Sequence, residues 1–112
     1  MKTSSYILIP SSSFGSDIAG TPQKAAAYYS KDKSVQTVSW YVTGFAGTIT
    51  IEATLDADNT SENYFPIHTI EWDGMTPLTE NDFANLTGNY TWIKATVTSF
   101  TQGNIGKVSI GY

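Results

Sequence analysis

Strict alternation of apolar and polar side chains between Thr48 and Leu55 constrains the fold more than any other feature of this sequence. The segment reads TITIEATL, and its apolar side chains are those of Ile49, Ile51, Ala53 and Leu55. Side chains of a β-strand point to opposite faces in turn, so a period of two residues predicts a strand with one buried face.

The residues just before this segment alternate in the same way. In SVQTVSWYV, the side chains of Val38, Trp40 and Val42 share one face. The link to the next strand, TGFAG, carries glycines at Gly44 and Gly47, which suit a short hairpin loop. The sequence therefore predicts a β-hairpin over residues 35–55.

The closing stretch predicts a second hairpin. In YTWIKATVTSF the side chains of Ile93, Ala95 and Val97 share a face, and after TQGN the alternation resumes through Val108, Ile110 and Tyr112. Gly103-Asn104 supplies the positive φ angles that a tight turn needs. A terminal strand with one apolar face is held in a sheet, and we expect Trp40 and Trp92 to be core residues of these two hairpins.

Three weaker strands are expected at Tyr6–Ile9, Ala25–Tyr29 and Tyr64–Ile70. Pro66 lacks an N–H for a sheet ladder, so the third should be an edge strand or contain a bulge. One helical turn is expected at 79–82, where a threonine precedes an aspartate by three residues.

The length and composition agree with a small β-protein. The 112 residues fit a single domain, 1–112, and only 14% are charged, so Ser, Thr, Asn and Gly must supply the polar surface. We predict an all-β fold, a small antiparallel β-sandwich of jelly-roll or immunoglobulin-like type with about 6–8 strands. Residues 10–24, rich in Ser, Gly and Pro, are predicted to form an extended loop or arm.

Charge and cysteine content argue against several classes of function. The net charge is -4 with six basic residues, so we expect no nucleic-acid binding. The chain has no cysteine, which excludes disulfides, thiolate metal ligands and a cysteine nucleophile. No apolar run reaches transmembrane length, and MKTSSYILIP lacks the apolar segment of a signal peptide, so neither membrane insertion nor secretion is expected.

Catalytic and metal-binding patterns are weak. The only histidine is His68, in a strand-like run, and no nucleophile elbow, phosphate loop or zinc-protease motif is present. LDADNTSEN spaces oxygen ligands at Asp56, Asp58, Thr60 and Glu62, but an EF-hand would need glycine where Ser61 stands. A looser calcium site in this loop stays an alternative to a solvated turn. We expect no enzyme and no cofactor.

Aromatic and apolar residues outside the predicted core are the better functional candidates. Trp72 precedes Asp73-Gly74 at a strand end and could anchor a protein contact or stack on a sugar. The arm could dock on a neighbouring subunit or pack on its own domain. The candidate interaction residues are Phe14, Ile18, Tyr28, Tyr64 and Trp72.

Several strings resemble small virion structural proteins of tailed bacteriophages, especially those of marine and cyanobacterial viruses. They are ILIPSSSFGSDIAGTPQKAAAYYS, GFAGTITIEATLDA, YFPIHTIEW and NLTGNYTWIKATVTSFTQGNIGKVSIGY, which span nearly the whole chain. The matching positions are Gly44, Phe45, Gly47, Leu55, Gly88, Asn89, Trp92, Ile93, Lys94, Gly103, Ile105 and Lys107. These motifs are structural, so the resemblance implies a kind of protein and no chemical activity.

The resemblance implies a non-enzymatic virion protein in the capsid, neck, tail, baseplate or fibre attachment. Its expected partners are other virion proteins, including further copies of itself, and its expected location is the virion, assembled in the host cytoplasm. Missing cysteines and the missing signal peptide agree with cytoplasmic assembly. The alternative is a carbohydrate- or receptor-binding module of a phage adhesion device, with exposed aromatic side chains stacking on sugars.

Overall fold

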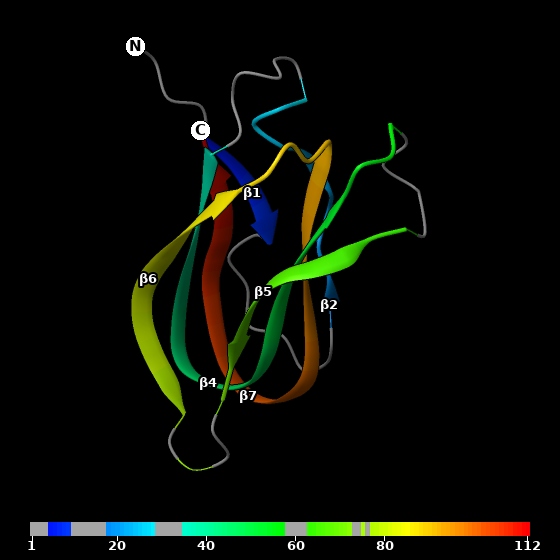
Figure 1. Cartoon of the computed structure of the whole chain (residues 1–112). Coiled ribbons are helices and arrows are strands. Elements are labelled where there is room, and N and C mark those ends of the chain that lie inside the picture. Colours follow the sequence, from blue (N-terminus) through cyan, green and yellow to red (C-terminus); the bar gives the residue numbers. More distant parts are fainter. Residues whose placement is uncertain (1–4, 10–17, 29–34, 58–62, 73–74, 76) are drawn as a thin grey trace.

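The computed structural model describes residues 5–9, 18–28, 35–57, 63–72, 75 and 77–112. These residues contain seven β-strands and no helix, which confirms the all-β prediction (Figure 1). The strands are β1 (Ser5–Ile9), β2 (Ile18–Ala19), β3 (Gln23–Lys24), β4 (Val35–Thr54), β5 (Phe65–Glu71), β6 (Leu78–Thr87) and β7 (Trp92–Gly111). All the pairings between them are antiparallel.

Two long strands, β4 and β7, form the centre of the sheet. Each has 20 residues, and they pair with each other from Thr37↔Gly111 to Thr54↔Trp92. Strands β1, β2 and β3 add to the far side of β7, while β5 and β6 add to the far side of β4. Figure 1 shows both long strands running down one side of the molecule and back up the other. The described strands therefore form one continuous sheet folded back on itself.

The two predicted hairpins are wrong, because each is a single bent strand. TGFAG lies inside β4 and TQGN lies inside β7, and the pairing between the strands shifts register between Thr43 and Ala46. Gly44 and Gly103 have positive φ angles of 58° and 104° at this point. An extra residue in one strand of a pair bends that strand without ending it. The glycines that resembled turn residues therefore lie where the sheet bends and do not separate two strands.

The predicted faces of the long strands are correct. Val38, Ile51, Val97 and Ile110 are among the inward side chains with no exposed surface. Leu8 and Ile9 of β1 join this core, because a register shift between Ile7 and Ile9 turns both inward. The full core cluster is Leu8, Ile9, Ala25, Val38, Trp40, Val42, Phe45, Ile49, Ile51, Ala53, Ile70, Ile93, Ala95, Val97, Ile105, Val108 and Ile110. Leu55 was predicted to share this face, but it lies beyond the end of β4 and is exposed.

The weaker strand predictions had mixed outcomes. Tyr6–Ile9 lies in β1, and Tyr64–Ile70 corresponds to β5, an outer strand whose register shifts next to Pro66 as expected. The expected helical turn at 79–82 is wrong, since these residues belong to β6. The expected strand at 25–29 is also wrong in its described part, because residues 26–28 form a turn.

Candidate interaction surfaces

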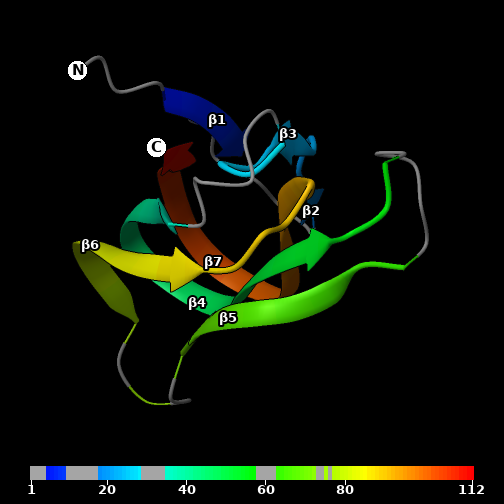
Figure 2. The same ribbon diagram turned by 45° about the horizontal axis from the view of Figure 1, so that its top comes forward.

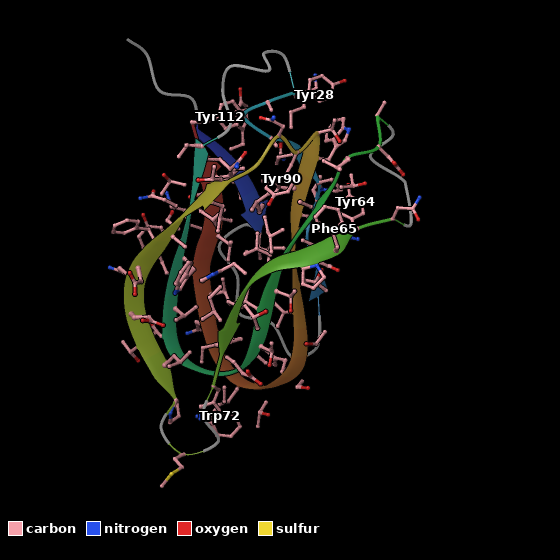
Figure 3. All side chains as sticks on the ribbon, in the orientation of Figure 1. Tyr28, Tyr64, Phe65, Trp72, Tyr90 and Tyr112 are labelled. Carbon is pink, nitrogen blue, oxygen red and sulfur yellow. The ribbon has the colours of Figure 1, made fainter. Side chains whose placement is uncertain are left out.

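Aromatic side chains gather at the end of the molecule where both long strands begin and finish. We call this group the aromatic end; its members are Tyr6, Tyr28, Tyr64, Phe65, Tyr90, Trp92 and Tyr112. Figure 3 shows its labelled members in the upper part of the molecule and Trp72 at the opposite end. The folded sheet explains this placement, because the bend brings the starts and ends of β4 and β7 to one pole.

The aromatic end consists of paired rings with two lysines. The ring centroids of Tyr28 and Trp92 lie 5.2 Å apart in an edge-on contact, and those of Phe65 and Tyr90 lie 6.0 Å apart in a similar geometry. A third pair joins Tyr6 and Tyr112 at 5.6 Å. Edge contacts of this kind add stability beyond the area that they bury.

The two lysines lie over tyrosine faces. The Lys24 Nζ is 4.8 Å from the ring centroid of Tyr28, and the Lys94 Nζ is 4.2 Å from that of Tyr64. Each ammonium group is thereby attracted to the negative face of a ring. These contacts place two positive charges at the aromatic end of a chain of net charge -4.

Side-chain hydrogen bonds fix the backbone under the aromatic end. The Gln36 side chain donates from Nε2 to the Leu86 carbonyl at 2.7 Å and accepts from the Ala26 N–H at 3.2 Å. The Thr91 hydroxyl donates to the Thr54 carbonyl at 2.9 Å, and the Trp92 Nε1 donates to the Ala57 carbonyl at 3.0 Å. The connections around the strand ends are thus held by side chains, because regular ladder pairing has ended there.

The five candidate residues do not form one site. Tyr28 and Tyr64 both lie at the aromatic end and are half-buried. The backbone of Ile18 pairs with Val97 in the main sheet. Phe14 lies outside the described residues. Trp72 lies at the opposite end, so the structure brings together two of the five.

The described part of the predicted arm, residues 18–24, lies on its own sheet. β2 and β3 both pair with β7, and the Thr21 N–H donates to the Leu8 carbonyl at 3.2 Å. Residues 10–17 of the predicted arm are not among the described residues. Of the two interpretations left open for the arm, this segment follows the one in which it packs on its own domain.

Trp72 is held by its backbone, and its indole N–H has no acceptor among the residues that the structure describes. The residue follows β5, and its backbone N–H donates to the Gly47 carbonyl at 3.0 Å. Its Nε1 atom is buried without a hydrogen-bond partner, although the residue as a whole is only half-buried. Burying an unpaired N–H costs about 1–3 kcal/mol. A binding partner could therefore contact part of the Trp72 ring but not its indole nitrogen.

Both outer strands on the β4 side carry exposed apolar residues. β5 and β6 each pair with β4 alone among the described residues. Phe65 on β5 has 38% of its surface exposed, and Phe83 on β6 has 60%. Phe83 was not among the predicted interaction residues, because part of this segment was expected to form a helical turn and few residues of LTENDFANLT are hydrophobic.

The remaining polar candidates are dispersed. The His68 ring lies 5.4 Å from Trp40, and the Asp56 carboxylate accepts a hydrogen bond from Asn63 at 2.9 Å. Asp58, Thr60 and Glu62 of the calcium alternative lie outside the described residues. In the part of the chain that the structure describes, no three His, Cys, Asp or Glu side chains are grouped so as to hold a metal ion. Among the same residues there is no helix long and apolar enough to cross a membrane.

Comparison with known proteins gave no match. No protein-family model matches this sequence, and no characterised protein or solved structure is significantly similar to it.

Proposed function

We propose that this chain is a non-enzymatic structural subunit of a tailed-bacteriophage virion that binds neighbouring virion proteins. Two lines of support lead to this proposal. One is the resemblance of its structural motifs to small phage virion proteins. The other is a surface suited to protein contacts, with two outer strands and an aromatic end.

The observation that carries the proposal is the exposure of phenylalanine on strands that have one unpaired edge. Phe65 and Phe83 are exposed on β5 and β6, and each strand pairs on one side only in the described structure. A neighbouring subunit can cover the exposed ring on either strand, and at β6, which has no proline, it can also satisfy the backbone groups of the edge. Aromatic side chains are also the residues that most often dominate interface energies.

The first region to alter in a test is the outer strands and not the N-terminal segment. Removing residues 1–24 would delete Leu8 and Ile9, both with no exposed surface, together with three strands that pair with β7. Such a truncation would unfold the chain, so its failure to assemble would say nothing about an interface. Point substitutions of exposed residues avoid this problem.

The experiment is to purify particles from cells that carry the gene in its native genome and to quantify the chain by peptide mass spectrometry. The wild-type chain is expected at a fixed copy number per particle. Phe65→Lys should reduce incorporation at least about tenfold, since a charge would be buried in the contact. Met75→Lys, at a residue with 84% exposure, is the matched control and should incorporate normally.

Wild-type chain missing from the purified particles would overturn the proposal. If both lysine variants were lost equally, Phe65 would have no specific role in the contact. The assignment to the virion would then depend only on whether the wild-type chain is found in the particles. The copy number also distinguishes locations, because hundreds of copies indicate a decoration or tail-tube protein and a few indicate the neck or baseplate.

A second candidate function is glycan or receptor recognition by an adhesion device. The observation that favours it is the exposed Phe65 ring, which lies edge-on to the Tyr90 ring and follows Tyr64, whose ring face is covered by Lys94. Aromatic rings at a wet surface can stack on the apolar face of a sugar. Trp72, the earlier candidate for this role, is less suitable because its indole nitrogen is buried.

A glycan array distinguishes this second function. Binding that is abolished by Phe65→Ala and kept by Met75→Ala would establish it. No binding across an array that includes bacterial surface glycans would reject it.

A further inference from the structure

Strand β6 has a long edge without proline or lysine, and its charged side chains are those of Glu80 and Asp82. It contains ten residues, and among the described residues it pairs with β4 alone. Figures 1 and 2 both show β6 as the outermost strand on its side of the fold. An unpaired edge presents a row of N–H and C=O groups that can pair with a further strand.

The other outer strand, β5, is protected where β6 is not. β5 has seven residues, includes Pro66, and changes register between its pairings with Ile51 and Glu52. Proline, bulges and short length are among the devices that block edge pairing. β6 has no proline, lysine or arginine, and its register with β4 is continuous from Thr87 to Glu80.

The outward face of β6 has the same residues in both directions. Its side chains in order are those of Thr79, Asn81, Phe83, Asn85 and Thr87. This order is a palindrome centred on Phe83. All five residues are exposed. When two copies pair about a two-fold axis at Phe83, this palindrome places residues of the same kind opposite each other, and because the five residues are uncharged the face can pair with its own copy.

From this palindrome we propose that β6 pairs antiparallel with β6 of a second copy of this chain, with the two-fold axis at Phe83. In this register the two Phe83 rings lie opposite each other. Asn81 lies opposite the second copy's Asn85, and Thr79 lies opposite the second copy's Thr87. Aromatic pairs and threonine pairs directly across an antiparallel ladder are both stabilising.

The inward face of β6 is compatible with the same register and disfavours a shift toward Asp82. With the axis at Phe83, Glu80 lies opposite Leu86 of the second copy and Asp82 lies opposite Ala84. No two carboxylates are directly opposed. Moving the axis by one residue to Asp82 would place that carboxylate opposite its own copy, which is unfavourable for a pair of like charges.

The polar partner of Asn85 agrees with this arrangement. The Thr37 hydroxyl donates to the Asn85 Oδ1 at 2.7 Å, which orients the amide group. The amide N–H groups of Asn85 can then donate to the Asn81 side chain of the second copy. This hydrogen bond occurs twice in the dimer because of the symmetry.

The inference goes beyond the proposed function, because it concerns the purified chain alone and would hold wherever the protein acts. In the dimer the β4–β6 half of each sheet continues into that of the other copy. The interface buries Phe83, whereas Phe65 and the aromatic end remain accessible to different partners.

The first test is sedimentation velocity of the full chain across a concentration series. We expect a reversible monomer–dimer equilibrium. Phe83→Lys and Phe83→Glu should each raise the dimer dissociation constant at least about tenfold, because like charges then meet at the axis. An equimolar mixture of the two variants should regain a dimer, since the lysine of one chain then lies opposite the glutamate of the other.

Engineered cysteines test the register, and the cysteine-free chain makes the result simple to interpret. Directly opposed residues of an antiparallel pair have Cα atoms about 4.5–5.5 Å apart, within reach of a disulfide. Phe83→Cys alone should crosslink to its own copy under mild oxidation. Asn81→Cys should crosslink to a chain carrying Asn85→Cys and only poorly to itself.

Leu55→Cys is the matched control, because Leu55 is 63% exposed against 60% for Phe83 and lies outside β6. It should not crosslink efficiently. Circular dichroism of every variant checks that the sheet is retained.

Two results would overturn the proposal. One is a wild-type chain that sediments as a monomer up to about 1 mM. At that concentration only dimers with a dissociation constant above about 1 mM would be mostly dissociated. The other is a dimer that forms equally well with Phe83→Lys, which would place the contact on another face. Neither result bears on whether the chain is found in purified particles, so the two proposals can fail separately.

Discussion

At the scale of single residues, Gln36 connects three segments through one buried amide. Its side chain is 1% exposed and joins the Ala26 N–H to the Leu86 carbonyl. Gln36→Met keeps the length of the side chain and removes its hydrogen bonds to the Ala26 N–H and to the Leu86 and Gly88 carbonyls, which leaves the Ala26 N–H without this acceptor. We expect a loss of about 2–4 kcal/mol in the free energy of unfolding, measured by urea titration.

Thr37→Val is the neighbouring control for this substitution. The Thr37 hydroxyl bonds the Asn85 side chain at an exposed position, where water can replace the lost partner. The expected change is within about 0.5 kcal/mol. Similar losses for the two variants would contradict the structural role assigned to Gln36.

The two tryptophans Trp72 and Trp92 permit an opposite-sign test of their indole N–H groups. The Nε1 of Trp72 is buried without an acceptor, whereas that of Trp92 donates to the Ala57 carbonyl. Replacing either residue by benzothienylalanine exchanges the N–H for sulfur with little change of shape. The replacement should stabilise the protein by about 1 kcal/mol at position 72 and destabilise it by about 0.5 kcal/mol at position 92, where the hydrogen bond is exposed.

Thermal or urea unfolding of the two semisynthetic proteins measures both changes. A destabilisation at position 72 as large as that at position 92 would mean that the Trp72 N–H does have an acceptor in solution.

At the scale of elements, the bends of β4 and β7 depend on two glycines with different surroundings. Both have positive φ angles, but a Cβ added at Gly103 would lie 2.4 Å from the Gly44 carbonyl oxygen, whereas one added at Gly44 meets nothing within 4 Å. Gly103→Ala combines backbone strain with a clash against main chain and should cost at least about 3 kcal/mol. Gly44→Ala carries only the strain, so its cost should be about 1 kcal/mol.

Chemical unfolding of both alanine variants gives the comparison. If the two costs were equal, the close approach of the strands at Gly103 would not contribute to the bend.

These glycines also explain which parts of the fold the sequence could predict. Alternation identifies the buried face of a strand locally, so Val38, Ile51 and Val97 were placed correctly. Whether a glycine pair ends a strand or bends it depends on the partner strand. The partner of β4 is β7, and in places the paired residues are more than forty positions apart in the sequence. The sequence pattern of TGFAG is compatible with a hairpin and with a bend, and only the long-range pairing decides between them.

The interaction surfaces, like the fold, could be predicted from the sequence only in part. Tyr28 and Tyr64 were selected as aromatic residues outside the core, and the folded sheet brings both to the same end. Trp92 was expected in the core and is only half-buried, because it lies on the opposite face of β7 from Ile93. Phe83 was missed because nothing in a single strand shows that its far edge is unpaired.

At the scale of the whole molecule, β4 and β7 run through both halves of the folded sheet, so neither half has an independent set of strands. β1 and β6 pair with one half of these strands, while β5, β2 and β3 pair with the other. Loss of one half would expose the inner face of the other. We therefore expect the two halves to unfold together in one cooperative transition.

Fluorine NMR of 5-fluorotryptophan-labelled protein tests this cooperativity without any mutation, since the three tryptophans report on different regions. Trp40 lies in the half that pairs with β6, Trp92 begins the other half of β7, and Trp72 lies near the bend. Their native signals should disappear with the same urea midpoint. Leu8→Ala, a cavity substitution in β1, should lower all three midpoints equally, by an amount equivalent to about 3 kcal/mol. If the Trp92 signal kept its wild-type midpoint in this variant, the halves would be separate folding units, because the damage to the half that contains β1 would not have reached the other.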